Sequence, residues 1–92
     1  MRKLSDDEIR SRLGELPGWE LRDSALAREF RFPDFVGAFA FMTKVALLAE
    51  SRNHHPDWKN VYNRVVVALS THDAGGITEL DFELAEAISA IA

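Results

Sequence analysis

The sequence contains no cysteine. A disulfide framework and a metal site built on thiolates are therefore excluded. Basic residues are in the minority, with 11 Lys and Arg against 15 Asp and Glu, which gives a net charge of −4. Because proteins that bind nucleic acids usually present a basic surface, this balance argues against nucleic acid as a direct partner.

Long apolar runs are also missing. No stretch approaches the roughly 20 apolar residues that a membrane-spanning helix needs, and residues 1–9 carry charges where a signal peptide has an apolar core. We therefore expect no membrane segment and a cytoplasmic location. At 92 residues and 47% hydrophobic composition, the chain is expected to form a single globular domain over residues 1–92.

A helix is predicted at residues 4–16. Ser5 and Glu8 fit a capping box, in which each side chain accepts a hydrogen bond from the backbone N–H of the other residue. Leu4 and Ile9 occupy the two positions of a hydrophobic staple. These four residues indicate where the helix begins.

A β-hairpin is predicted at residues 19–32, with its turn at Asp23 and Ser24. Alternation with a period of two predicts a half-buried second strand. Its mainly apolar face would carry Leu26, Arg28, Phe30 and Phe32.

The longest predicted helix spans residues 34–52, with Asp34 as its N-cap. Between residues 35 and 49 only Thr43 and Lys44 are clearly polar. A surface helix of a monomer would show a single apolar stripe, whereas this helix is apolar almost all round. A domain of this size offers little to cover a second face, so we expect another subunit to cover it.

Residues 58–71 are rich in β-forming residues and could form one long strand or two short strands bent near Asn63. The alternation places Val61, Val65, Val67 and Leu69 on one face, and Tyr62, Val66 and Ala68 on the other. Thr78 and Asp81 then resemble a second capping box before a final helix. The element order αββαβ(β)α predicts an α+β fold, an antiparallel sheet with helices on one face.

All three histidines lie between residues 54 and 72. Pro56 disfavours helix just before it, so the long helix should end near His54 and leave His54 and His55 on a corner. If the helix reaches that far, Glu50 shares a face with His54. His72 follows a strand and precedes a Gly-Gly loop.

Imidazoles titrate near pH ~6.5, so a group of them beside a carboxylate suits proton transfer. Nucleophilic catalysis is less favoured, because cysteine is absent and Ser70 has no other sign of a triad. A metal site is a second reading, although adjacent His ligands are awkward geometrically. Simpler structural roles stay open for the His pair on the surface, for Asp81 as a cap, for Trp19, Trp58 and Tyr62 in the core, and for Asn60 and Asn63 in turns.

Two linked motifs resemble the signature of the pterin-4a-carbinolamine dehydratases, over about a third of the chain. The first is Glu50-x-x-x-His54-His55-Pro56-x-Trp58-x-Asn60-Val61-Tyr62-Asn63-x-Val65. The second is Leu69-Ser70-Thr71-His72-x-x-x-Gly76-Ile77-Thr78-x-x-Asp81. The resemblance implies a four-stranded antiparallel sheet with three helices packed on one face, in the order αββαββα, and a homodimer or homotetramer.

The resemblance also implies an activity. Members of the family dehydrate the 4a-hydroxytetrahydropterin (4a-hydroxytetrahydrobiopterin) that aromatic amino acid hydroxylases release, and they give quinonoid dihydropterin for recycling. No metal or organic cofactor takes part. The expected catalytic residues are His54, His72 and His55. The expected substrate-binding residues are Glu50, Asp81, Trp19 and Thr71.

Within this set, our hypothesis is that His54 and His72 transfer protons and that His55 mainly binds and orients the substrate. Which histidine is the acid and which the base stays open. Asn53 departs from animal members of the family, which carry an acid before the His pair; an amide could orient His54 but supplies no charge.

Two other functions are compatible with the sequence. Animal members of the family also bind a homeodomain transcription factor and stabilise its dimer, so the chain could be a protein-interaction module. It could also bind a pterin outside hydroxylase recycling, for example in a molybdenum-cofactor pathway.

Overall fold

The computed structural model describes all 92 residues, Met1–Ala92, and its elements follow the order αββαββα. The predicted α+β fold is confirmed. The helices are α1 (Asp6–Leu13), α2 (Phe35–Ser51) and α3 (Glu79–Ile91), with a short 3-10 helix, η1 (His72–Ala74), before α3. The strands are β1 (Glu20–Arg22), β2 (Ala25–Arg31), β3 (Asp57–Val61) and β4 (Arg64–Leu69).

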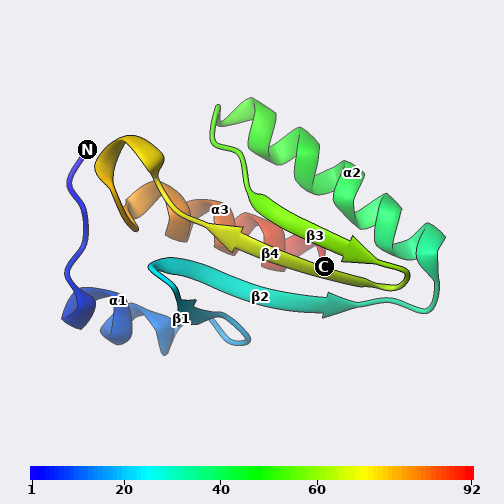
Figure 1. Cartoon of the computed structure of the whole chain (residues 1–92), viewed down its shortest axis with the longest axis horizontal. Helices are drawn as coiled ribbons and strands as arrows, with labels where there is room; N and C mark the ends of the chain where they lie inside the picture. Colours follow the sequence, from blue (N-terminus) through cyan, green and yellow to red (C-terminus); the bar gives the residue numbers. More distant parts are fainter.

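The four strands form one antiparallel sheet in the order β1-β2-β4-β3. Two-residue turns close both hairpins. Asp23 and Ser24 adopt φ of 51° and 63°, the left-handed pair that matches the twist of a hairpin. Tyr62 and Asn63 separate β3 from β4, so residues 58–71 are two strands and not one. Figure 1 shows α3 behind the sheet and α2 along its β3 side.

The core lies between the sheet and the helices. Leu26 and Phe30 of β2 are buried there. Arg28 shares their face, as predicted. Its guanidinium lies 4.5 Å from the centre of the Phe30 ring and donates to the Pro17 carbonyl oxygen and to Ser89 Oγ. Cation–π contact and two acceptors make this charge compatible with an apolar face.

The prediction for Val61 was wrong. Val65, Val67 and Leu69 are buried on the helix side, but Val61 is 52% exposed. The two-residue turn pairs Val61 with Arg64, and residues directly opposite each other in an antiparallel pair share a face. Val61 therefore lies on the open face of the sheet, because the turn shifts the alternation between the two strands.

The predicted helix starts are confirmed. Ser5 Oγ accepts from the Glu8 N–H at 3.2 Å and Glu8 Oε1 accepts from the Ser5 N–H at 2.9 Å. Leu4 and Ile9 are both buried, as the staple requires. Asp34 caps α2 by accepting from the Gly37 N–H at 2.7 Å. The first helix ends at Leu13, before the predicted limit.

Glu8 gives a prediction for acid conditions. A hydrogen bond from Arg2, followed by one from the Ser5 N–H, lowers the pKa of the Glu8 carboxyl from 4.5 to about 2. Its contribution to stability is therefore complete above about pH 4.5 and is lost as the pH falls toward 2. In the Arg2→Ala variant, ¹³C NMR of the carboxyl should show a higher Glu8 pKa. Arg10→Ala is the control, and a Glu8 pKa unchanged by Arg2→Ala would contradict the assignment.

The second face of α2 is exposed, as its composition predicts. Ala38, Phe41, Val45 and Ala49 are buried against the sheet and α3. The opposite side presents Phe35, Val36, Phe39 and Leu47, each about half exposed or more. No helix in the structure combines the length and the apolarity that crossing a membrane requires.

Candidate active site

Two connections meet at one end of the sheet. One joins α2 to β3 and carries His54 and His55; the other joins β4 to α3 and carries Thr71 and His72. Figure 1 shows both at the end near the N-terminus, together with the turn between β1 and β2. The antiparallel order of the sheet brings these three segments to the same end.

The end of α2 determines where the histidine pair lies. Asn53 adopts φ of 50°, its N–H bonds the Glu50 carbonyl oxygen at 3.1 Å, and the His54 N–H bonds the Ala49 carbonyl oxygen at 3.0 Å. This is a Schellman motif, and asparagine tolerates its left-handed position better than most residues. Asn53 thus acts through its backbone, and its side chain makes no hydrogen bond to His54.

The helix ends at Ser51, so Glu50 and His54 do not share a helical face. The condition of that prediction, a helix that reaches His54, is not met, because the left-handed Asn53 turns the chain first. Each of the two adjacent histidines instead contacts a carboxylate of its own: His54 contacts Asp81 from α3, and His55 contacts Glu50.

The His54–Asp81 pair is the most buried polar feature of this end. His54 Nε2 lies 2.5 Å from Asp81 Oδ1, the Asp81 side chain is fully buried, and the His54 side chain is 10% exposed. The other oxygen, Oδ2, accepts from Thr71 Oγ1 at 2.9 Å and from the Thr78 N–H at 2.9 Å. Asp81 is therefore both the predicted cap of α3 and the partner of His54.

Thr78 extends this network. Its hydroxyl lies 2.7 Å from Thr71 Oγ1, whose only hydrogen is given to Asp81, so Thr78 donates to Thr71. Every bond in the chain Thr78–Thr71–Asp81–His54 thus has one donor and one acceptor. Such a fully satisfied network fixes the position of the imidazole.

This arrangement assigns the tautomer of His54. A carboxylate only accepts, so Nε2 carries the hydrogen that faces Asp81. Nδ1 of the neutral ring then holds a free lone pair and has no partner in the protein. Because no buried side-chain nitrogen or oxygen lacks a hydrogen bond, Nδ1 must reach the surface, where it can exchange a proton with a ligand.

The other two histidines are exposed. His55 Nε2 lies 3.0 Å from Glu50 Oε1, with both side chains more than half exposed. His72 begins η1 directly after Thr71 and lines a hollow of about 250 Å³ with no hydrophobic residue in its wall. Through Thr71, which also lines it, this hollow touches the Asp81 network.

Trp19 is not brought to this end. It is buried in the core, its ring packs edge-on against Phe30, and its Nε1 donates to Ser89 Oγ at 2.8 Å. Ser89 is eight residues beyond Asp81 on α3, about 12 Å along the helix axis. The geometry therefore favours a core role for Trp19.

The two asparagines near the β3–β4 turn have structural roles. Asn60 donates to the carbonyl oxygens of Tyr62 and Arg64, and Asn63 donates to that of Phe32. Trp58 is half-buried beside the core, while Tyr62 is exposed at the turn. The structure gathers no group of three His, Cys, Asp or Glu side chains suited to a metal ion.

Comparison with known proteins gives a consistent result. The sequence profile of the family described as pterin 4 alpha carbinolamine dehydratase matches residues 2–91. A chain from Prochlorococcus marinus is 51% identical over 96% of this chain and 92% of its own length. A chain from Solibacter usitatus is 54% identical over 98% and 95%. Both carry a provisional assignment as pterin-4-alpha-carbinolamine dehydratase.

A solved structure shares the fold. The crystal structure of a transcriptional coactivator/pterin dehydratase from Brucella melitensis superposes with a TM-score of 0.95 at 46% identity, and covers 99% of both chains. Sequence and fold thus agree over nearly the whole length. The chain belongs to the pterin 4 alpha carbinolamine dehydratase family.

Proposed function

We propose that this protein dehydrates a 4a-hydroxytetrahydropterin to quinonoid dihydropterin, within the recycling of tetrahydropterin for aromatic amino acid hydroxylation. The observation that carries the proposal is the His54–Asp81 pair, held by Thr71 beside the hollow that His72 lines. A pure binding module has no need of a buried imidazole held in one tautomer and linked, through Asp81 and Thr71, to the wall of a polar hollow.

The reaction needs one acid and one base. The C–O bond at the 4a carbon breaks, and the departing hydroxyl takes a proton from the acid and leaves as water. A base accepts the proton of a ring nitrogen, whose electrons form the new C=N double bond. Imidazoles can fill both roles near neutral pH, and no covalent intermediate with the protein is needed.

We assign the proton transfers to His54 and His72, and substrate orientation to His55. His54 presents Nδ1 while Asp81 holds Nε2. His72 is exposed in the wall of the hollow. His55 and its partner Glu50 are both exposed. The His55 side chain can therefore change its rotamer when a ligand binds. Asp81 is fully buried and acts through His54, whereas Thr71 both holds Asp81 and lines the hollow, where it can contact the substrate.

A coupled assay tests the recycling role. An aromatic amino acid hydroxylase, a dihydropterin reductase with NADH and a small amount of tetrahydropterin are combined so that dehydration limits turnover. Addition of this protein is expected to raise the steady-state rate of NADH oxidation. An unchanged rate, with hydroxylase and reductase both in excess, would count against recycling.

We also infer that the exposed face of α2 packs against a second copy, in a homodimer or homotetramer. Phe35, Val36, Phe39 and Ala40 line an apolar depression of about 320 Å³ on this face. An apolar patch of this kind on a helix that is otherwise well packed is typical of an interface.

Phe39→Asp tests this interface. Because Phe39 is 56% exposed in the single chain, the change should leave the fold intact but lower the mass measured by size-exclusion chromatography with light scattering. Ser11→Asp adds the same charge to exposed α1 and should not change the mass. A monomeric wild type, or a Phe39→Asp variant that keeps the wild-type mass, would contradict self-association through this face.

The second candidate function is a protein-interaction module. The Brucella relative is called a coactivator as well as a dehydratase, and the α2 face could receive another protein. A monomeric wild type without dehydratase activity would favour this function. Binding of a pterin outside recycling is the remaining alternative, and the cytoplasmic location stays a prediction.

A further inference from the structure

Thr78 does more than cap α3. Its hydroxyl oxygen accepts from the Leu80 N–H at 3.3 Å, which is the part of the bonding that an N-cap requires. A cap uses only this acceptor, so on a surface helix the hydroxyl hydrogen is free to face water. Thr78 is fully buried, and its hydrogen is given instead to Thr71 Oγ1, 2.7 Å away.

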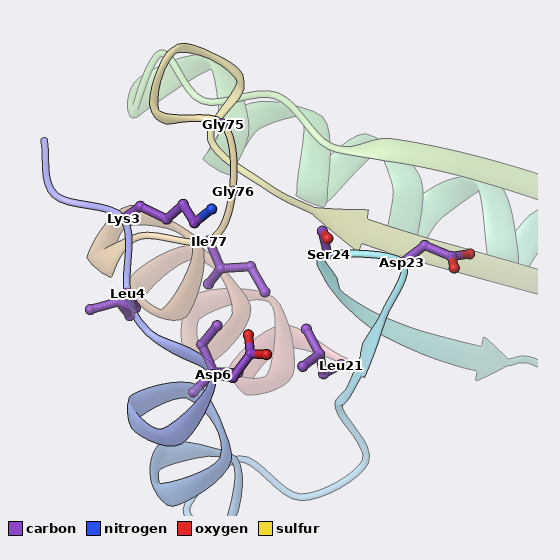
Figure 2. A pocket seen from close by; sticks show the side chains of 10 residues that line it. Lys3, Leu4, Asp6, Leu21, Asp23, Ser24, Gly75, Gly76 and Ile77 are labelled. Atoms are coloured by element: carbon purple, nitrogen blue, oxygen red, sulfur yellow. The ribbon is translucent and has the colours of Figure 1, made fainter.

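The backbone before Thr78 is held on two sides. The Leu4 N–H donates to the Ile77 carbonyl oxygen, and the Thr71 N–H donates to the Gly76 carbonyl oxygen, both at 2.8 Å. Figure 2 shows the N-terminal segment passing beside Gly76 and Ile77 at the start of α3. These bonds fix where the Thr78 side chain begins, so its hydroxyl has a defined position relative to Thr71.

The Thr71 hydroxyl has competing partners. Thr71 is half-buried and lines the hollow beside His72, so a ligand there could draw its hydrogen away from Asp81. Donation from Thr78 occupies one lone pair of Thr71 and holds its side chain by a second bond. A hydroxyl that accepts a hydrogen bond also becomes a stronger donor. Both effects keep the Thr71 hydrogen on Asp81 Oδ2.

We infer that Thr78 is a positioning residue for the dehydration reaction, and that it acts on His54 through Thr71 and Asp81. The inference rests on the proposed function, which supplies the reaction that His54 performs. Thr78 neither lines the hollow nor bonds a histidine. Its residue type follows from the two bonds, because a hydroxyl supplies a donor and an acceptor, whereas Val supplies neither and a carboxylate has no hydrogen.

Steady-state kinetics of the Thr78→Val and Thr78→Ser variants test the inference. Valine nearly keeps the shape of threonine but loses the hydroxyl, so Thr71 is held by Asp81 alone. We expect kcat to fall about tenfold, the effect of one hydrogen bond, while KM stays within about twofold. Serine keeps the hydroxyl, so Thr78→Ser should retain at least about half of the wild-type kcat.

Ser5→Ala is the matched control, because Ser5 caps α1 in the same way and has no bond to the histidine site. Both Ser5→Ala and Thr78→Val lose a cap and should be less stable to urea, but only Thr78→Val should lose kcat. Wild-type kcat in Thr78→Val, or an equal loss in Ser5→Ala, would overturn the inference. So would a Thr78→Ser variant as impaired as Thr78→Val.

The route through Thr71 has its own test. In a Thr71→Ala background, Thr78→Val should cause no further loss of kcat, and a second tenfold loss would contradict action through Thr71. NMR of the wild type covers the case in which Thr78→Val does not fold. The hydroxyl hydrogens of Thr71 and Thr78 should both exchange slowly with water, and rapid exchange of either would overturn the inference.

The outcomes separate this inference from the proposed function. An active wild type with an equally active Thr78→Val variant would keep the enzyme and remove the role of Thr78. A folded wild type that does not accelerate dehydration would remove the proposed function, and with it the reaction that Thr78 serves, whatever the exchange of the two hydroxyl hydrogens.

Discussion

Asp81→Ala is expected to lower the free energy of unfolding by about 3 kcal/mol or more, because each buried donor left without an acceptor costs about 1–3 kcal/mol and three donors lose theirs. The side chain is fully buried, and its loss leaves the His54 Nε2–H, the Thr71 hydroxyl and the Thr78 N–H without their acceptor. Denaturation by urea, followed by circular dichroism, measures the change. A loss below about 1 kcal/mol would contradict the network described here.

The Asp81→Asn variant separates the role of Asp81 in folding from its role in the dehydration reaction. The amide oxygen can replace Oδ2 as acceptor for Thr71 and Thr78, so the cap of α3 should survive. The amide NH₂ then faces His54 Nε2, which must become the acceptor, and the ring hydrogen moves to Nδ1. The variant should remain folded and lose dehydratase activity about a hundredfold or more, because the exposed lone pair is gone.

Imidazole ¹⁵N shifts of His54 provide a readout that a merely structural role would not change. They should report a hydrogen on Nε2 in the wild type and on Nδ1 in Asp81→Asn. Wild-type activity in Asp81→Asn, or the same tautomer in both proteins, would remove the positioning role of Asp81.

His72→Ala is expected to lower kcat/KM about 10²–10³-fold, within the range for loss of a general acid or base. Because the His72 side chain is exposed and makes no hydrogen bond within the protein, the free energy of unfolding should change by less than about 0.5 kcal/mol. The two measurements together distinguish catalysis from folding.

His55→Ala is the matched comparison. Its ion pair with Glu50 is exposed and therefore adds little to stability. If His55 only orients the substrate, its replacement by Ala should raise KM and change kcat little. A loss of kcat in His55→Ala larger than that in His72→Ala would reverse the roles assigned to the two residues.

Local signals account for the parts of the structure that the sequence predicts. The caps at Ser5, Asp34 and Thr78 act within three residues, so their side chains and backbone partners are adjacent in the chain. The composition of α2 predicts two apolar faces, because the helical period alone determines which side chains share a face. The positions of Asp23 and Ser24 indicate a tight turn for the same local reason.

Longer-range features could not be predicted in this way. Asp81 reaches His54 across 27 residues of chain, and no periodicity signals which carboxylate lies nearest to which imidazole. The left-handed Asn53 ends α2 before His54, so the condition under which Glu50 and His54 would share a helical face is not met. The two-residue turn at Tyr62 and Asn63 places Val61 on the open face of the sheet, against expectation. The hollow beside His72 combines the β1–β2 turn with the β4–α3 connection, and it forms only once the sheet is assembled.

A stopped-flow dehydration assay tests the central claim most directly. Pterin carbinolamine is generated in place, and formation of the quinonoid product is followed with wild type, with His72→Ala and with buffer alone, since the carbinolamine also dehydrates unaided. The account predicts clear acceleration by the wild type and a rate close to that of buffer with folded His72→Ala. A folded wild type that does not exceed buffer would contradict dehydration, and a fully active His72→Ala would contradict its histidine mechanism.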